Sequence, residues 1–215
     1  MRVPTPRKIK NMDTTDGELA ERVFGVHLRS DAYAKAVEVL QAADRLLRVN
    51  PAATLEEIAQ EAGASRATIY RRFPTRGDLL VALSRWAVGR IVIALEDAQI
   101  NVPPAEEALY RATLNVIEIK VGLEYSRTLA PADDPVVAKS QAQMRELAIR
   151  LLTQCRESGL IAPEADLDWV LTVFYALVHE AAVSGRAGGA ETPDQIASRV
   201  VDTLLHGVGA TTSMD

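Results

Sequence analysis

The chain repeats apolar residues at helical spacing along most of its length. Ala36, Leu40, Ala43 and Leu47 fall on one face of a helix predicted between about residues 31 and 49. We find no strand-like alternation of useful length, so we expect an all-α fold. The same reasoning predicts further helices at residues 15–29, 54–62, 65–73, 76–100, 105–119, 121–129, 134–158, 166–186 and 193–207.

Capping signals divide residues 54–80 into short helices joined by a tight turn. Thr54 with Glu57 three residues later has the spacing of a capping box at the start of the first helix. Gly63 follows that helix, where a residue with positive φ lets the chain turn sharply. Ser65 is suited to cap the second helix, which ends at a proline.

The second of these helices exposes side chains that suit DNA. Its outer positions hold cations, hydroxyls and a phenol, whereas Ile69 and Phe73 point inward. Such side chains bind phosphates and base edges, and a helix-turn-helix places its second helix in the major groove. The alternative is a surface helical hairpin whose arginines only solvate it. The outer residues are Arg66, Thr68, Tyr70, Arg71 and Arg72.

Several residues in this stretch form a motif: Leu55-x-x-Ile58-Ala59-x-x-Ala62-Gly63, Ser65, Thr68-Ile69-Tyr70, Phe73 and Arg76-x-x-Leu79. The motif resembles the TetR family of bacterial transcriptional repressors over roughly residues 33–85. The family usually has Lys in place of Arg76 and often His in place of Arg71 or Arg72. The resemblance implies an N-terminal three-helix helix-turn-helix domain and a larger C-terminal helical domain for effector binding and dimerisation. It also implies a repressor whose DNA affinity falls when a small, often apolar molecule binds.

These features predict four parts of the chain. We expect a partly disordered N-terminal arm at 1–30, a helix-turn-helix DNA-binding domain at 31–76, an effector-binding and dimerisation domain at 77–209, and a disordered tail at 210–215. The basic arm either reaches into a minor groove or is a plain tail. The resemblance implies that the long helix from residue 76 is the one that ligand binding moves.

The charge distribution favours DNA binding by the N-terminal part. The net charge is −5, but residues 1–90 hold 15 Lys/Arg against 11 Asp/Glu, whereas residues 91–215 hold 9 against 18. Within residues 63–90, six arginines accompany a single acidic residue, Asp78. Basic charge concentrated on one segment is typical of polyanion binding.

We predict separate roles for the candidate DNA contacts. Arg66 and Thr68 are the base-reading candidates, because Arg can bond guanine through two atoms and a Thr methyl can touch thymine. Phosphate contacts are assigned to Tyr70, Arg71 and Arg76. Arg76 lies at the N-terminus of a predicted helix, which adds partial positive charge there. The full predicted set is Thr54, Ser65, Arg66, Thr68, Tyr70, Arg71 and Arg76.

The predicted helix at 166–186 is apolar around most of its circumference. A helix of this kind is buried on all sides, which in a chain of this size suggests a partner subunit. With the helix at 193–207 it would form a four-helix bundle across a twofold axis. A twofold dimer requires a palindromic operator, with recognition helices about 34–36 Å apart or a multiple of one helical turn. The alternative is that this helix is central to the core of a single chain.

The effector site is harder to predict. Pockets are mostly apolar with a few convergent polar groups, and the C-terminal part offers aromatic and polar-tipped residues that could line one. Each is also explained as a core residue at helical spacing, and His179 as a hydrogen-bonded core histidine. The candidates for a site that binds a small, largely apolar effector are Trp86, Tyr110, Tyr125, Phe174, Tyr175 and His179.

Other classes of function find little support in the sequence. Cys155 is the single cysteine, no cluster has metal-ligand spacing, and we expect no metal and no cofactor. No phosphate loop, nucleophile elbow or paired carboxylates indicate an enzyme. The N-terminus lacks an apolar signal core, and the apolar run Trp169–Val183 is too short to span a bilayer, so we expect a cytoplasmic protein. The remaining alternative is a ligand-independent DNA-binding or architectural protein.

Overall fold

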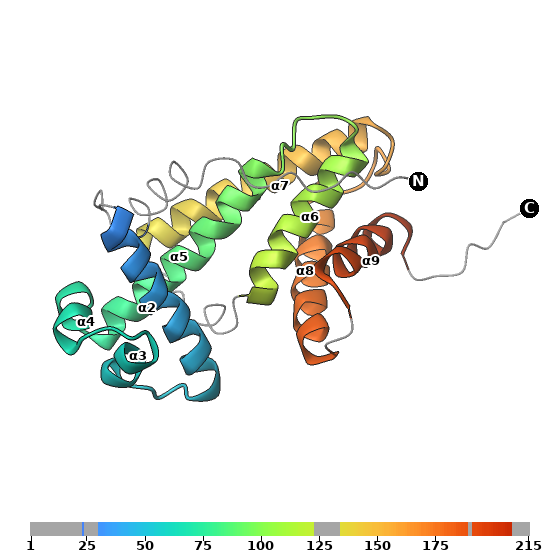
Figure 1. Ribbon diagram of the computed structural model, residues 1–215. Helices are drawn as coiled ribbons and strands as arrows, with labels where there is room; N and C mark the ends of the chain where they lie inside the picture. The colour runs from blue at the N-terminus through green and yellow to red at the C-terminus, as the bar shows by residue number, and fades with distance from the viewer. Residues whose placement is uncertain (1–22, 24–29, 123–133, 189–190, 208–215) are drawn as a thin grey trace, which may run out of the picture. The chain divides into compact units, whose positions relative to one another are not determined.

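The computed structural model describes residues 23, 30–122, 134–188 and 191–207, and within these ranges it contains helices and no strands. The predicted all-α fold class is therefore confirmed. The predicted helices at 15–29 and 121–129 fall largely outside the described residues. The helices (Figure 1) are α2 (Ser30–Val49), α3 (Leu55–Glu61), α4 (Arg66–Arg72), α5 (Arg76–Asp97), α6 (Ala105–Gly122), α7 (Pro135–Glu157), α8 (Leu167–Gly188) and α9 (Pro193–His206).

The chain divides into two compact units. Unit 1 comprises residues 1–93 and 124–139, and unit 2 comprises residues 94–123 and 140–215. The division falls inside α5 and α7, so each of these helices contributes residues to both units. The boundaries predicted at residues 31, 77 and 210 separate parts of the chain by function, whereas the two units are defined by how compactly the chain packs. The functional boundaries therefore remain predictions.

Unit 1 packs α2 against the short helices α3 and α4. The predicted inner face of α2 is buried, with Leu40 and Leu47 fully inaccessible to solvent. Ile58 from α3 and Ile69 from α4 are also fully buried, and Phe73 is 2% exposed. The seven-residue helices α3 and α4, which are too short to be stable alone, are therefore held by an apolar core that they share with the longer α2.

The first part of α5 belongs to the same unit and turns two arginines inward. Arg85 donates to both carboxylate oxygens of Asp134, with Nε at 3.2 Å from each and Nη2 at 2.8 Å from one. Arg90 lies over the ring of Trp86, with its guanidinium carbon 5.0 Å from the ring centroid. Burial lowers the pKa of the Arg90 guanidinium. Arg85 therefore links α5 to the residue before α7, whereas the Arg90 contact lies within α5.

Unit 2 packs α6, α8 and α9 against one another (Figure 1). Side chains of α6 also hold the last turn of α5. Arg111 donates from Nε to the Ala98 carbonyl (3.1 Å) and from Nη2 to the Val102 carbonyl (3.1 Å), while the Asn115 amide donates to the Ala94 carbonyl (2.9 Å). The Ala98 carbonyl directly follows α5, where helix carbonyls lack a partner within the helix, so the Arg111 side chain of α6 supplies a donor there.

The long apolar helix α8 is buried on one side only. Leu171, Phe174 and Val178 are buried, whereas Trp169 is 65% exposed, and the side chains of Tyr175 and Val183 are also exposed. The alternative in which this helix is central to a single-chain core is therefore wrong. The one-sided burial leaves an apolar face that a partner could cover.

The prediction that this apolar run is too short to span a bilayer does not hold by length and composition alone. A window of 18 residues, Leu167–Ser184, has a mean hydropathy of 1.2, which is long and apolar enough to cross a membrane by length and composition. One such helix is weak support for a span, because the core helix of a soluble protein has the same composition.

Candidate nucleic-acid interface

The predicted capping signals form as hydrogen bonds in unit 1. The Glu57 amide donates to the Thr54 hydroxyl (3.2 Å), and the Thr54 amide donates to the Glu57 carboxylate (2.7 Å), which completes the capping box. Gly63 has φ +63°, the left-handed conformation expected for the turn between α3 and α4. Thr75 and Asp78 cap the start of α5 in the same reciprocal way.

Ser65 is the N-cap of α4, as predicted. The Thr68 amide donates to the Ser65 hydroxyl (3.1 Å), and the two hydroxyl oxygens lie 2.9 Å apart, within hydrogen-bond distance. Both hydroxyls are therefore engaged within α4. The Thr68 methyl group takes no part in these bonds, and it is the part of the side chain that a thymine methyl would contact.

Tyr70 has a partner that the sequence did not reveal. Its phenol donates a hydrogen bond to the carboxylate of Glu56, which is the second residue of α3. This bond raises the pKa of Tyr70 and lowers the pKa of Glu56. The charge of Arg66 also lowers the pKa of Glu56, although less than the phenol does. No local signal could indicate this contact, because the two residues are 14 positions apart.

Arg66 and Arg71 are exposed on α4. Neither guanidinium makes a hydrogen bond or an ion pair to a residue that the structure describes. Arg72 lies nearer the core, and burial lowers its pKa. The two exposed guanidiniums are therefore available to an outside anion.

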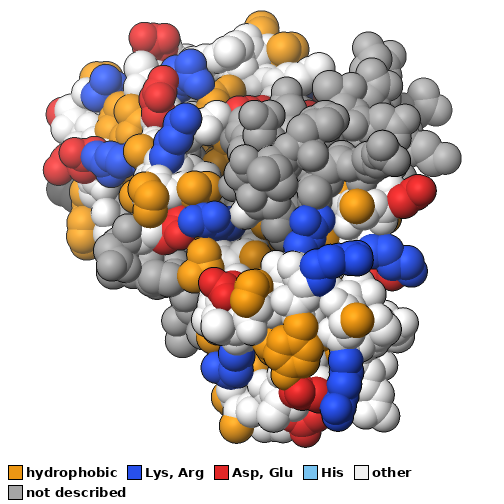
Figure 2. Space-filling model, turned by 90° about the vertical axis from the view of Figure 1, so that its left-hand side faces the viewer, with side chains coloured by type: hydrophobic (Ala, Val, Ile, Leu, Met, Phe, Trp, Pro, Cys, Tyr) orange, Lys and Arg blue, Asp and Glu red, His pale blue; other side chains and the backbone are white. Residues whose placement is uncertain are grey.

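Arg76 lies in the first turn of α5 as predicted, but its guanidinium is engaged within unit 1. It bonds the carbonyls of Ala53 and Pro51. Because Arg85 and Arg90 also have internal contacts, the basic face is smaller than the count of six arginines suggested. Figure 2 views the side on which α3 and α4 lie in Figure 1, and it shows acidic as well as Lys and Arg side chains there.

The structure does not bring the candidate effector residues together. Trp86 belongs to unit 1, where it is 2% exposed, while Tyr125 lies outside the described residues. Tyr110 donates a hydrogen bond to the Asp194 carboxylate at the start of α9, and burial together with this bond raises its pKa to about 12. Tyr110 is therefore explained by packing between α6 and α9.

The candidates on α8 point in different directions. Phe174 is buried, whereas Tyr175 and His179 are exposed. The interpretation of His179 as a core histidine was therefore wrong. When a helix is apolar around most of its circumference, its sequence does not indicate which side faces the core. The positions of Phe174, Tyr175 and His179 could therefore not be predicted.

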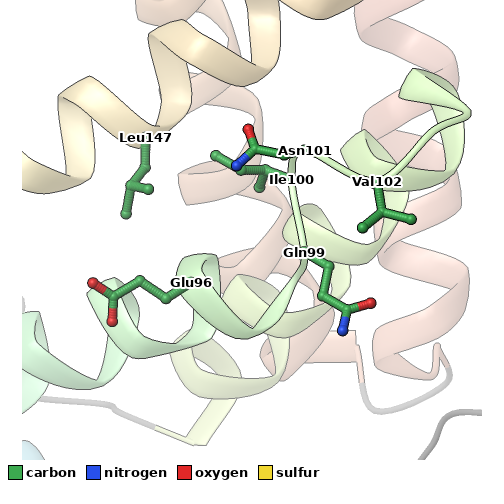
Figure 3. A pocket seen from close by; sticks show the side chains of 6 residues that line it. All are labelled: Glu96, Gln99, Ile100, Asn101, Val102 and Leu147. Atoms are coloured by element: carbon green, nitrogen blue, oxygen red, sulfur yellow. The ribbon is translucent and has the colours of Figure 1, made fainter.

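A hollow of about 330 Å³ in unit 2 is lined by other residues. They are Glu96, Gln99, Ile100, Asn101, Val102 and Leu147 (Figure 3). The side chains of Glu96 and Gln99 point away from each other in this view, so the polar groups do not converge on one point. The arrangement differs from a ligand site, in which a few polar groups fix one orientation.

The remaining polar chemistry of the described residues is structural. The Cys155 thiol is buried, and burial raises its pKa to about 11, so it is a poor nucleophile. Within the described ranges, no group of three or more His, Cys, Asp or Glu side chains could hold a metal ion.

Comparison with known proteins gives consistent matches. Residues 39–83 match the family of bacterial regulatory proteins described as the tetR family. The HTH-type transcriptional repressor LfrR of Mycolicibacterium smegmatis is 30% identical over 176 residues, which cover 79% of this chain and 88% of the repressor.

Solved structures match over a similar length. The TetR-like regulator LfrR from Mycobacterium smegmatis in complex with proflavine has a TM-score of 0.64 at 24% identity, covering 83% of this chain and 99% of that one. The regulator FadR from Bacillus subtilis in complex with stearoyl-CoA has a TM-score of 0.65 at 16% identity, covering 80% and 99%. These relatives are transcriptional regulators rather than enzymes. The chain belongs to the TetR family of transcriptional regulators.

Proposed function

We propose that this regulator is a sequence-specific repressor that a small, largely apolar effector releases from a palindromic operator. The observation that carries the proposal is the outer side of α4, where Arg66 and Arg71 are exposed beside a closed helix-turn-helix core. Guanidiniums that make no hydrogen bond or ion pair to the described residues are suited to phosphates and guanine edges.

The DNA contacts divide into two kinds. We assign base reading to Arg66 and Thr68, with Ser65 beside them, and phosphate binding to Tyr70 and Arg71. Tyr70 must exchange its bond to Glu56 for a bond to phosphate. Thr54 starts α3 and is assigned to the DNA backbone next to the turn. Arg76 is left out of this set, because its guanidinium donates to the carbonyls of Ala53 and Pro51.

The dimer would form through α8 and α9. The exposed Trp169, Tyr175 and Val183 form an apolar face of the kind that obligate dimer interfaces bury. Family membership supports the same assembly. Two copies related by a twofold axis would present two α4 helices to half-sites about 34–36 Å apart, or a multiple of one helical turn. Coverage by a partner, rather than by lipid, agrees with a cytoplasmic regulator.

The effector would act by a population shift. The α5 helix contributes residues to both units, so a change in unit 2 has a continuous path to the residues that hold α4. A ligand shifts such an equilibrium only by its difference in affinity for the two states. Two related structures contain proflavine and stearoyl-CoA, which supports a small effector with a large apolar part. Equal affinity of the effector for free and DNA-bound protein would contradict this mechanism.

The test is selective DNA binding over a salt series. A duplex from upstream of the protein's own gene, or one enriched from a random pool, is compared with unrelated DNA because basic surfaces bind any duplex by counterion release. We expect selective binding to be lost in the Arg66→Ala, Thr68→Ala double variant. Arg150→Ala is the matched control, since it removes an exposed arginine of α7 whose ion pair within the described residues is with Glu146 on its own helix.

The other outcomes separate the alternatives. Equal and steeply salt-dependent binding to every duplex would favour an architectural DNA-binding protein. An enriched sequence without a twofold repeat would contradict the palindromic operator. Loss of selectivity in Arg150→Ala as well would show that the double variant acts by general charge.

A further inference from the structure

Arg76 joins the start of α5 to the turn between α2 and α3. Its Nε donates a hydrogen bond to the Ala53 carbonyl (3.1 Å), and its Nη2 donates one to the Pro51 carbonyl (2.5 Å). The two carbonyls lie 23 and 25 residues earlier in the chain. The guanidinium is partly buried by these contacts.

One of these bonds fixes the residue that begins α3. The Ala53 carbonyl and the Thr54 amide belong to the same planar peptide group. Arg76 bonds its oxygen, and the Glu57 carboxylate accepts a bond from its nitrogen (2.7 Å). A peptide plane held at both its donor and its acceptor keeps the Thr54 backbone in place, while the Thr54 hydroxyl is oriented by its own bonds to the Glu57 amide (3.2 Å) and carboxylate (2.9 Å).

The turn itself is closed on the other side. The Ala53 amide donates to the Asn50 carbonyl (3.0 Å), and the Ala52 amide donates to the Asn50 side-chain oxygen (3.2 Å). The Ala53 methyl group is fully buried. Arg76 is therefore the contact that connects a closed turn to a different helix.

We propose that Arg76 is a positioning residue for DNA binding, acting through Thr54 instead of contacting a phosphate itself. The inference rests on the proposed function, because it assumes that Thr54 touches DNA. The lysine that the family usually has at this position could not make both of these bonds from the same two positions. Its ammonium lies at the end of a flexible chain, whereas one of the two donors of Arg76 is the Nε within the stem.

The experiment uses the full-length protein and a duplex enriched from a random pool by the wild type. Affinity and its salt slope are measured for Arg76→Lys, Arg76→Ala, Thr54→Ala and the Arg76→Lys, Thr54→Ala double variant, at a temperature where circular dichroism shows each is folded. We expect Arg76→Lys to bind about tenfold more weakly with an unchanged salt slope. In the Thr54→Ala background the same change should cost less than about twofold.

Arg71→Ala is the matched control, because Arg71 is an exposed arginine on α4 without an internal partner among the described residues. Its removal should reduce the salt slope by about 0.9 per subunit and leave the melting temperature unchanged. If Arg76→Lys does not fold, Arg76→Gln replaces it in the same cycle, since its amide keeps one donor.

Each remaining outcome decides the question. Wild-type affinity in Arg76→Lys, with a reduced salt slope in Arg76→Ala, would make Arg76 a phosphate contact and overturn the inference alone. An equal loss in both Thr54 backgrounds would reduce Arg76 to a stabilising residue and also overturn it. If the wild type enriches no sequence, the proposed function fails, and the inference fails with it.

Discussion

Helices α4 and α8 each bury one side and expose the other, but the exposed sides differ in chemistry. On α4 the exposed side carries Arg66, Arg71 and the 41% exposed Tyr70, around a buried Ile69. On α8 the exposed side carries aromatic and aliphatic residues, with Trp169 the most exposed. One face suits a polyanion and the other suits a protein surface.

The difference matters because the two faces would be covered by partners that respond to different conditions. Contacts to phosphate release counterions and weaken with salt. Burial of apolar surface depends little on salt at moderate ionic strength and is proportional to the area removed from water. Each face can therefore be tested with the other as its internal control.

The largest effect should come from salt. Raising the salt concentration from 50 to 200 mM should weaken operator binding by about a hundredfold or more, because each phosphate contact contributes about −0.9 to the logarithmic slope. The dimer dissociation constant should change by less than about threefold. Fluorescence anisotropy and analytical ultracentrifugation measure the two constants. A dimer as salt-sensitive as the DNA complex would mean that charges, rather than the α8 face, hold the subunits.

Trp169→Asp should weaken the dimer by about a hundredfold, equivalent to about 3 kcal/mol, because it removes an aromatic anchor and places a charge in an apolar interface. Ultracentrifugation over a concentration series measures the change. The control is Val102→Asp, which changes a 47% exposed apolar residue outside α8. Dissociation by the control to the same extent would place the interface elsewhere.

Ser65→Ala should lower the free energy of unfolding by about 1 kcal/mol, because the N-cap bond to the Thr68 amide is lost. Urea denaturation of the free protein measures the change. Ser65→Thr is the control, since it keeps an oxygen that can accept the bond. A full loss of DNA selectivity in the threonine variant, with stability retained, would show that Ser65 also reads a base.

The smallest change should follow from Tyr70→Phe, which removes the hydrogen bond that lowers the pKa of Glu56. The pKa of Glu56 should rise toward its ordinary value, and an NMR titration of the carboxyl group measures it. A lowered pKa contributes stability that is present above the unfolded pKa and is lost as pH falls through the folded pKa. The variant should lose less than the wild type, because only the backbone hydrogen bond and the Arg66 charge still lower the pKa of its Glu56.

Glu57 is the control for that titration. Its pKa is lowered by hydrogen bonds from Thr54, not from Tyr70. The charge of Glu56 raises the pKa of Glu57 only as the smallest of its causes, so Glu57 should shift much less than Glu56 between the wild type and Tyr70→Phe. An equal shift of both carboxyls would show that the variant changes the start of α3 rather than one bond.

The sequence predicted the parts of unit 1 that depend on neighbouring residues. The caps at Thr54 and Ser65, and the turn at Gly63, each rely on groups within a few positions of one another. Such local signals have the same meaning in any fold. The helix-turn-helix and most helix limits in the described ranges were therefore predictable.

Contacts between distant residues were not predictable in this way. Arg85 meets Asp134 across 49 positions, and Tyr110 meets Asp194 across 84. Periodicity defines a residue's direction around its own helix, but it does not say which neighbouring helix lies on that side. For this reason the charge pattern predicted a larger basic face than the structure has. For the same reason, the aromatic residues predicted to line one effector site do not lie together.

The burial of Cys155 makes the chain convenient for spectroscopy. Its thiol is inaccessible, and its raised pKa keeps it protonated at neutral pH. A spin label could therefore be attached at an introduced cysteine, such as Ala67→Cys on the exposed side of α4, without replacing the native one. A homodimer would carry two labels, and pulsed electron resonance would read the separation of its two α4 helices with and without a candidate effector.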